Sequence, residues 1–548
     1  MDFHPPSVWT PAGLRIPLRR RSAGPALVSP FLNFPTSSDA VTHVIEFIVF
    51  LPLLAALAIL VGAPARPTAL AAAFVGLITV LVVAFQFNPD HEVVGGFAYQ
   101  FTSSLPVLLD AKGNAVLSLA FGLDGMSLVM VLLTALVLPA AILVSPPESG
   151  IKGNPRLYYL SSLLIAAGAL GAFCSTDLFF FYAFHELALI PTFLMIGMFG
   201  HGANRVKTAW TITLYLGAGS LVLLGGLVAL FYASGGTTFD ISEMVQQAKI
   251  IGPAESDRWV YLVLLIGFGS LVSLFPFHTW AARAYAEAPT PTAMLHAGVL
   301  KKFGLYGLLR IAQPMLPDGA EAWQNLVLVL LLGNILFVGY STIAQKRLDL
   351  MLGNSSVMHM GFIFLGVASA NVIGAHGAVM LMFAHGISIA LLFALCGGLR
   401  ERFGSTDMAE IGGGLATKMP RFGIIFAMAA FASIGLPGFA NFASEILVFF
   451  GAFEPMQKSG ATTLGPLQWT CVLALWGVVI SAVYMLRAFR RLFNGPVRVG
   501  APDCADLTPA EQVPLVLLLG VLLLVGFVPG LLLKYLTPSL ELFSTLGR

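Results

Sequence analysis

The chain has 548 residues, of which 57% are hydrophobic and only 10% are charged, and its formal net charge is +2. A soluble domain usually carries about 25% charged residues, so this composition excludes an ordinary soluble protein and indicates an integral membrane protein. The basic residues are scattered through the loops, which gives no sign of a nucleic-acid partner.

The N-terminal segment, residues 1–42, is rich in proline and has no helical periodicity. Its arginines, Arg15, Arg19, Arg20 and Arg21, are not followed directly by an apolar core of the signal-peptide type. Either the segment is a disordered extension, or translation starts later, near Val41. We prefer the later start, and N-terminal sequencing of the purified protein would decide.

From residue 43 onward, apolar segments of about 20 residues follow one another, the length that one transmembrane helix needs. They lie near 44–63, 68–87, 122–145, 157–174, 176–199, 208–232, 259–280, 292–314, 324–344, 354–371, 374–399, 422–452, 467–488 and 512–535. The sequence therefore predicts an all-α integral membrane protein of about 14 transmembrane helices. Cys174, Cys396 and Cys471 lie in apolar runs and are expected to pack as small hydrophobic side chains, and no metal site is predicted.

Some of these segments are interrupted. The segment 259–280 carries Pro276, and Gly435-Leu436-Pro437-Gly438 divides 422–452. A helix broken at membrane depth is tolerated only where protein or a water-filled cavity surrounds the freed backbone groups. Broken helices in both halves, 176–302 and 324–452, favour two inverted repeats around a transport pathway.

Glu186 is the first ionisable residue deep inside a predicted helix, in Phe-His-Glu-Leu, five positions before Pro191. A charged group in lipid costs about 2.5–3.5 kcal/mol on insertion scales, so it is a functional candidate by default. A structural carboxyl satisfied by a neighbouring helix is the alternative. His185 points about 100° away on a helix, which favours a packing or hydrogen-bonding role for it.

Lys301 and Lys302 follow, in the middle of the segment 292–314. A buried lysine gives up its proton readily, because desolvation disfavours the charged form. Adjacent residues of a helix cannot face one direction, so one lysine is expected to line a water path while the other pairs elsewhere. Apolar neighbours on both sides weaken the alternative that both lysines snorkel to an interface.

His359, His385 and Glu445 complete the set. Each histidine alone could be a satisfied core residue. Glu445 follows the Gly-Leu-Pro-Gly interruption, where a gated exit would place a carboxyl group. Together with the earlier glutamate and the lysines they form a row of titratable groups on successive helices, a pattern typical of proton relays.

Lysine and arginine are unevenly distributed between alternate loops, with most of them in the loops that hold Lys152, Arg205, Arg347, Arg400 and Arg421. The positive-inside rule places those loops inside and both termini outside, which in a bacterial inner (plasma) membrane is the periplasmic side. The four arginines of residues 1–42 do not fit this orientation.

At these residues the sequence resembles the antiporter-like, proton-translocating subunits of respiratory NADH:quinone oxidoreductase, most closely the subunit M (chain 4) type. The resemblance rests on stretches that extend over roughly residues 44–535 and include Phe184-His185-Glu186-Leu187, Pro276-Phe277-His278-Thr279-Trp280, Ala297–Gly307, Asn354–Gly361 and Gly435–Gly438. The chain stops after the fourteenth predicted segment, without the long amphipathic C-terminal helix of the L-type subunits.

The resemblance implies that quinone reduction elsewhere in a complex drives protons along Glu186, Lys302 and Glu445, with His359, His385 and Lys301 as connecting residues. It implies no cofactor and no redox chemistry on this chain. NADH, FMN, iron–sulfur clusters and quinone would belong to the other membrane and hydrophilic subunits. We expect transmembrane helices in 43–145, the translocating core in 146–452 and the C-terminal helices in 453–548.

One position departs from the family pattern. Leu271 stands where the family has a lysine that pairs with the glutamate at the position of Glu186. Three interpretations remain: Lys301 substitutes, Glu186 works without a lysine, or the chain pumps poorly and couples its neighbours. The competing functions are a cation/proton antiporter subunit, and a related membrane hydrogenase or inorganic-carbon uptake complex, because partners define these and fold analogy does not.

Overall fold

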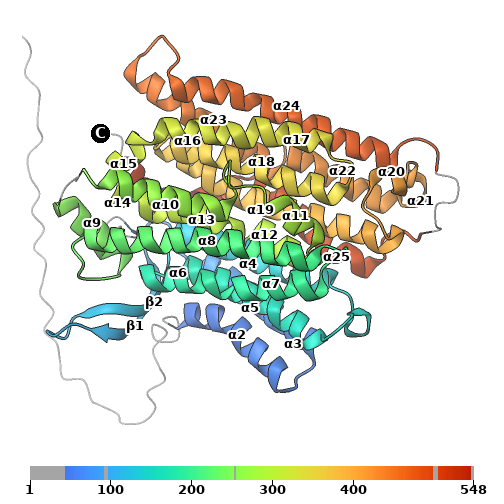
Figure 1. Cartoon of the computed structure of the whole chain (residues 1–548), viewed down its shortest axis with the longest axis horizontal. Helices are drawn as coiled ribbons and strands as arrows, with labels where there is room; N and C mark the ends of the chain where they lie inside the picture. The colour runs from blue at the N-terminus through green and yellow to red at the C-terminus, as the bar shows by residue number, and fades with distance from the viewer. Residues whose placement is uncertain (1–42, 92–96, 252–254, 498–503, 545–548) are drawn as a thin grey trace, which may run out of the picture. The chain divides into compact units, whose positions relative to one another are not determined.

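The computed structural model describes residues 43–91, 97–251, 255–497 and 504–544, which belong to one compact unit that spans Val41–Arg548. The predicted N-terminal extension, residues 1–42, lies outside the described residues. The described part is a bundle of helices that run roughly side by side (Figure 1).

In chain order the bundle begins with α2 (Val44–Val61), α3 (Ala65–Gln86), β1 (Gln100–Leu109), β2 (Ala115–Leu123), α4 (Gly125–Val144), η1 (Glu148–Gly150), α5 (Pro155–Cys174), α6 (Leu178–Leu187), α7 (Leu189–Phe199) and α8 (Arg205–Ala233). The middle contains α9 (Ile241–Ile251), α10 (Asp257–Val272), α11 (Ala281–Glu287), α12 (Thr290–Gly298), η2 (Leu300–Lys302), α13 (Phe303–Gly307), η3 (Leu308–Ala312), α14 (Gln313–Met315), α15 (Pro317–Ala322), α16 (Gln324–Leu332), η4 (Gly333–Val338) and α17 (Gly339–Ala344). The last part comprises α18 (Leu348–Ala368), α19 (Val372–Phe403), α20 (Met408–Ile411), α21 (Leu415–Lys418), α22 (Pro420–Ile434), α23 (Ala440–Ser459), α24 (Pro466–Phe493), α25 (Pro509–Phe527), α26 (Gly530–Leu540) and η5 (Glu541–Ser544).

The multi-span helical architecture predicted from the sequence is confirmed, but the count of 14 is not. Among the described residues, 11 helices are long and apolar enough to cross a membrane, and α22 is a shorter apolar helix. The predicted segments at 259–280, 292–314 and 422–452 do not qualify. Helix α10 ends at Val272, the segment 292–314 is divided into several short elements, and 422–452 is divided into α22 and α23, neither of which meets the criteria of length and apolarity.

A β-hairpin that the sequence analysis did not predict connects α3 to α4. Its strands β1 and β2 are antiparallel, with Pro106 opposite Ser118. In the turn, the Asp110 carboxylate accepts hydrogen bonds from the backbone N–H groups of Lys112 and Asn114, and its bonds with Asn114 lower the pKa of Asp110 below its usual value. A search for 20-residue apolar segments does not detect such strands.

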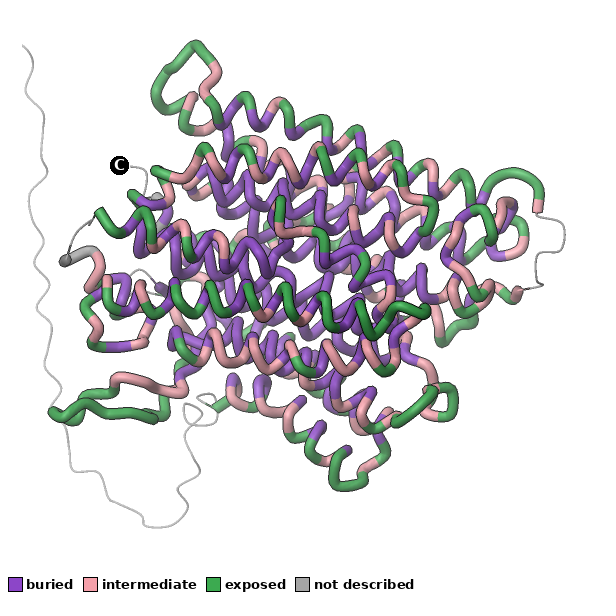
Figure 2. Tube along the Cα trace, in the orientation of Figure 1, coloured by how far each residue is buried: buried purple, intermediate pink, exposed green. Residues whose placement is uncertain are grey.

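Burial separates an outer shell from a centre, as Figure 2 shows. Helices α2, α3 and α8 leave many large apolar side chains exposed, which suits contact with lipid or with neighbouring subunits. The most apolar part of α19 is completely buried, and this helix packs against α18, α23, α12 and α4. Cys174, Cys396 and Cys471 are buried as predicted.

Two interruptions come close to the centre. After α12 the chain forms the single 3-10 turn η2 before it continues as α13. Helix α22 ends at Ile434 because Gly435 adopts φ +81°, a left-handed conformation that glycine tolerates, and α23 begins at Ala440. Each interruption frees backbone carbonyl groups that a continuous helix would use.

Candidate functional site

Glu186 lies at the end of α6 and faces α8. Its Oε1 accepts a short hydrogen bond from the Ser220 hydroxyl of α8, and His185 Nδ1 lies 3.3 Å from the same oxygen. The Glu186 side chain keeps 30% of its surface exposed. The His185 ring stacks on Phe303 at 4.0 Å between ring centroids, in line with the packing and hydrogen-bonding role predicted for it. This carboxyl group is therefore hydrogen-bonded and reachable from the surface of the chain.

The two lysines occupy η2 and diverge, as the sequence predicts for adjacent residues. Lys302 Nζ donates to the Ala297 carbonyl at 2.6 Å and lies 3.0 Å from His385 Nδ1 of α19. Lys301 Nζ lies 3.4 Å from the Ser356 hydroxyl of α18 and 5.6 Å from the centre of the Tyr285 ring. Both lysines are fully buried, and within the described ranges no ion pair joins either of them to a carboxylate.

His385 continues the row toward α18. Its ring centroid lies 5.4 Å from that of His359. The two ring nitrogens of His359 face carbonyl oxygens, Nδ1 at 2.8 Å from Ser355 O and Nε2 at 3.0 Å from Ser433 O. The Ser433 carbonyl belongs to the last turn of α22, so the interruption after Ile434 is what leaves it free for the imidazole.

Glu445, on α23, is buried against the same interruption. A Cβ atom added to Gly435 would lie 2.5 Å from Glu445 Oε2, so the carboxyl group is in contact with this glycine. No hydrogen bond joins the Glu445 side chain to another residue in the part of the chain that the structure describes. The acid that follows the interruption in sequence therefore also contacts it in the structure.

The structure brings Lys302, His385 and His359 into one file, but it does not join Glu186 to a lysine. Leu271, at the departure from the family pattern, is buried on α10. Lys301 contacts Ser356 and Tyr285, and its Nζ makes no described contact with Glu186. Lys301 therefore does not replace the missing lysine through a direct ion pair with Glu186.

Several polar residues of the row were missed from the sequence. His296 of α12 is buried, and its Nδ1 lies 3.4 Å from the hydroxyl of Tyr285, the residue whose ring faces Lys301. Its place in an apolar helix could have revealed it by the criterion applied to His359. Tyr484 of α24 bonds to Ser355 at 2.7 Å, and Asn441 Nδ2 lies 3.4 Å from Ser388 Oγ. Short polar residues such as these carry no signal in a single sequence.

A cavity of about 770 Å³ opens at the loop end of the bundle, on one side of α11. His278 and Glu287 line it, and each has one buried polar atom to which the described part of the chain offers no hydrogen-bond partner; Asn354 lines the α18 wall. Helix α11 separates this cavity from Lys301: Arg283 and Glu287 face the cavity, whereas Tyr285 contacts the lysine. The positive charge of Lys301 also acts on His278.

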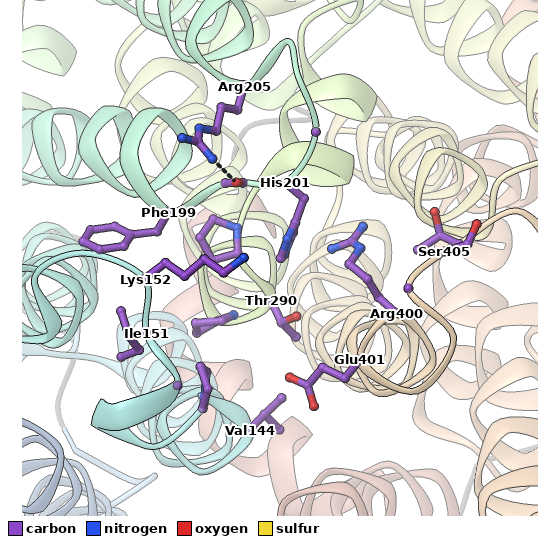
Figure 3. Close-up of a pocket in the computed structure, with 18 of the residues that line it drawn as sticks. Val144, Ile151, Lys152, Phe199, His201, Arg205, Thr290, Arg400, Glu401 and Ser405 are labelled. Carbon is purple, nitrogen blue, oxygen red and sulfur yellow. Dashed lines mark hydrogen bonds between the residues drawn. The ribbon is translucent and has the colours of Figure 1, made fainter. Parts of the chain in front are cut away.

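A second cavity, of about 750 Å³, opens among the loops that the charge pattern places inside (Figure 3). Lys152, His201, Arg400 and Glu401 project into it, and Arg205 bonds to the Gly200 carbonyl at its edge. Burial, and then the positive charge of Arg400, lower the pKa of His201 to about 4, so this imidazole is neutral at physiological pH.

One buried ion pair lies outside the row. Arg310 of η3 donates from two nitrogens to the Asp124 carboxylate at 2.6 and 2.5 Å. The aromatic rings of Phe97, Tyr99 and Tyr306 surround the guanidinium carbon at 5.1–5.4 Å. Asp124 also caps α4 through Ser127. Every charge here is compensated, which indicates a structural role.

Comparison with known proteins shows which family the chain resembles. The sequence model described as NADH:quinone oxidoreductase/Mrp antiporter, TM matches residues 175–465. The chain is 34% identical over 493 residues to NAD(P)H-quinone oxidoreductase chain 4 1 of Synechococcus elongatus, with 88% of each chain covered. It is 31% identical to F(420)H(2) dehydrogenase subunit M of Methanosarcina mazei over 84% of this chain and 89% of that one.

Solved structures agree. A chain of respiratory complex I from Thermus thermophilus superimposes with a TM-score of 0.80 at 30% identity, covering 92% of this chain and 99% of that chain. A chain of the Mrp complex from Dietzia superimposes with a TM-score of 0.76 at 20% identity, covering 93% and 98%, which shows a shared fold.

Proposed function

The chain belongs to the NADH:quinone oxidoreductase/Mrp antiporter family as a chain 4 (subunit M) type member, and we propose that it translocates protons through the buried row of Glu186, Lys301, Lys302, His385, His359 and Glu445. Members of this type are multi-pass membrane subunits of larger assemblies, here a complex I-like NADH:quinone oxidoreductase. The observation that carries the proposal is the contact of Lys302 Nζ with His385 Nδ1 at 3.0 Å, in a cluster to which the described residues bring no compensating carboxylate.

Proton uptake begins at the cavity of about 770 Å³. Its lining supplies His278 and Glu287, two groups that exchange protons, on the side of α11 opposite Lys301. A proton that reaches the lysines is held against a carbonyl oxygen and a hydroxyl, which stabilise an ammonium only weakly. Lys301 and Lys302 are therefore suited to a transient charge.

The next step transfers a proton from the Lys302 ammonium to His385 Nδ1, which leaves a neutral amine and an imidazolium. We place the proton next on His359, whose ring centroid lies 5.4 Å from that of His385, and then on Glu445 beside the interruption after α22. No other reactant is consumed. The Glu445 carboxyl group is then neutral until the proton leaves toward the opposite side of the membrane.

We propose that the energy for the cycle comes from a change of charge in neighbouring subunits, which shifts the protonation of the lysines. Two opposite charges about 4 Å apart interact by about 4 kcal/mol at an effective dielectric constant near 20, enough to shift a lysine between its two protonation states. Glu186 is suited to receive this signal, because it is partly exposed at the surface of the chain and lies 3.3 Å from His185, whose ring stacks on Phe303 directly after η2. Glu186 thus works through imidazoles in place of a lysine partner.

We place NADH, FMN, iron–sulfur clusters and quinone on partner subunits. We also propose the inner (plasma) membrane as the location, with the loops of Lys152, Arg205 and Arg400 inside and both termini outside, because these loops carry the basic excess. Residues 146–452 are the proposed translocating core, since they contain the complete row.

The test uses the assembled complex in proteoliposomes. Lys302→Met should lower proton translocation at least tenfold while the complex assembles normally. The exposed lysine Lys534, replaced by Met, is the matched control and should leave translocation unchanged. Full translocation by Lys302→Met would contradict the proposal. Purification in a mild detergent should yield iron–sulfur partner subunits; small membrane subunits alone would favour a cation/proton antiporter.

A further inference from the structure

His359 differs from the other histidines of the bundle in what its nitrogens face. Both of its partners, Ser355 O and Ser433 O, are carbonyl oxygens, at 2.8 and 3.0 Å. A carbonyl oxygen only accepts, and a neutral imidazole has one N–H group and one nitrogen lone pair. Both contacts are hydrogen bonds only when the ring carries two N–H groups, which makes it an imidazolium.

His376 offers an internal comparison on α19. Its Nδ1 also faces a carbonyl oxygen four residues earlier, Val372 O, at 2.7 Å. Its Nε2 faces the Thr537 hydroxyl at 3.3 Å, and a hydroxyl can donate. The Thr537 hydroxyl also reaches Leu533 O at 2.9 Å, and when it rotates to donate to Nε2 the neutral form of His376 satisfies both contacts. The neutral form of His359 has no such donor and leaves one lone pair pointed at a carbonyl oxygen.

The second carbonyl is the informative one. Ser433 lies at the C-terminal end of α22, where the unpaired carbonyl groups carry the negative end of the helix dipole. Gly435 ends the helix there, and Glu445 contacts the same glycine. Glu445, the proton acceptor at the end of the row, and the Ser433 carbonyl, which faces His359, therefore lie at the same interruption.

We propose that His359 is a proton-dependent latch, in which the imidazolium ties α18 to the broken end of α22 and the neutral imidazole releases the Ser433 carbonyl. The proposal rests on the proposed relay and adds a conformational step to it. A proton on His359 closes the latch; its transfer to the Glu445 carboxylate leaves a neutral imidazole and a carboxylic acid, and the interruption loosens. Proton exit is thus coupled to opening at Gly435–Gly438.

The surrounding charges determine when the latch closes. Lys301 and Lys302 of η2 and His385 of α19 act on His359 with positive charge, so a proton on these residues opposes closure. Tyr484 of α24 bonds to Ser355 of α18, and Glu445 of α23 contacts Gly435, two residues after Ser433, so an ionised Glu445 favours a positive charge on His359 and closure of the latch. A single proton therefore occupies either the lysine cluster or the latch.

The experiment compares hydrogen exchange of the peptide over residues 431–439 in the assembled complex, each variant against the unchanged protein at the same pH. His359→Arg keeps the charge and should protect this peptide at every pH tested. His359→Gln cannot acquire a charge and should lose protection at low pH by about tenfold, the effect of one charge-assisted hydrogen bond. His376→Gln is the matched control and should match the unchanged protein.

Proton translocation, measured on the same samples, separates the two levels of the argument. Both His359 variants should translocate at least tenfold less, because neither cycles between closed and open. Equal protection in His359→Gln and the unchanged protein, together with lost translocation, would overturn the latch and keep the relay. Full translocation by both variants would overturn the role of His359 altogether.

Discussion

Lys302 and Arg310 are two buried cations eight residues apart, and their surroundings differ in one respect. Arg310 has a bidentate carboxylate, Asp124, and three aromatic rings, whereas Lys302 has a carbonyl oxygen and an imidazole. A guanidinium does not lose its proton in proteins, and an ammonium does. The comparison shows how the two cations differ in role. A cation that is paired with a carboxylate, such as Arg310, stabilises the fold, whereas one without such a partner, such as Lys302, is suited to releasing its proton.

The largest expected effect is on stability at the compensated site. Arg310→Met should destabilise the protein by about 3–5 kcal/mol, because it leaves the Asp124 carboxylate buried and unpaired. Asp124→Asn in the same chain should restore most of this loss, since asparagine still caps α4. Thermal unfolding of the detergent-solubilised complex measures both. A double variant as unstable as the single one would show that charge compensation is not the cause.

Gly435→Ala probes the interruption that the uncompensated row uses. A left-handed backbone costs a residue with a Cβ about 1–2 kcal/mol, and the new atom would also press on Glu445. We expect a modest loss of stability and a several-fold loss of proton translocation. Gly460, at the end of α23, has a similar φ of +65°, and a Cβ atom added there would meet nothing within 4 Å. Gly460→Ala should therefore lower stability without affecting translocation. Equal translocation by the two variants would argue against a role for the interruption.

Lys301→Ala and Leu271→Lys address the departure from the family pattern. The proposed pathway assigns Lys301, beside Tyr285, to proton uptake, so its loss should slow translocation about threefold to tenfold without affecting assembly. Leu271→Lys, which introduces the family's lysine, should not rescue that loss, because Lys301 is not a partner of Glu186. Rescue by the double variant would instead favour substitution of one lysine by the other.

The last prediction concerns Asp177, an acid at the start of α6 for which the described residues supply no cation partner. Burial raises the pKa of its carboxyl group to about 6. The folded state therefore binds this proton more tightly than the unfolded state, whose pKa is near 3.9, and stability falls as pH rises from about 4 to 6. Asp177→Asn should remove this fall while it preserves the cap of α6. An unchanged pH profile of the unfolding temperature would contradict the assignment.

Much of this arrangement was predictable from the sequence, for a physical reason. Lipid forbids uncompensated charge, so Glu186, Lys302 and Glu445 stand out in apolar segments without any structure. The β1–β2 hairpin, His296 and Tyr484 were not found, because ordinary polar residues and short strands carry little signal in one chain. The partners of each nitrogen, and above all the Ser433 carbonyl, depend on how α22 ends against α18, which only the fold determines.

The most direct test of the central claim exchanges the chemistry of the two cations. Protons translocated per quinone reduced should be measured for Lys302→Arg and Arg310→Lys in the reconstituted complex. We predict that Lys302→Arg, which keeps the charge but cannot release its proton, translocates at least tenfold less, while Arg310→Lys translocates normally. Normal translocation by Lys302→Arg would show that the buried lysine supplies only charge and would contradict the account.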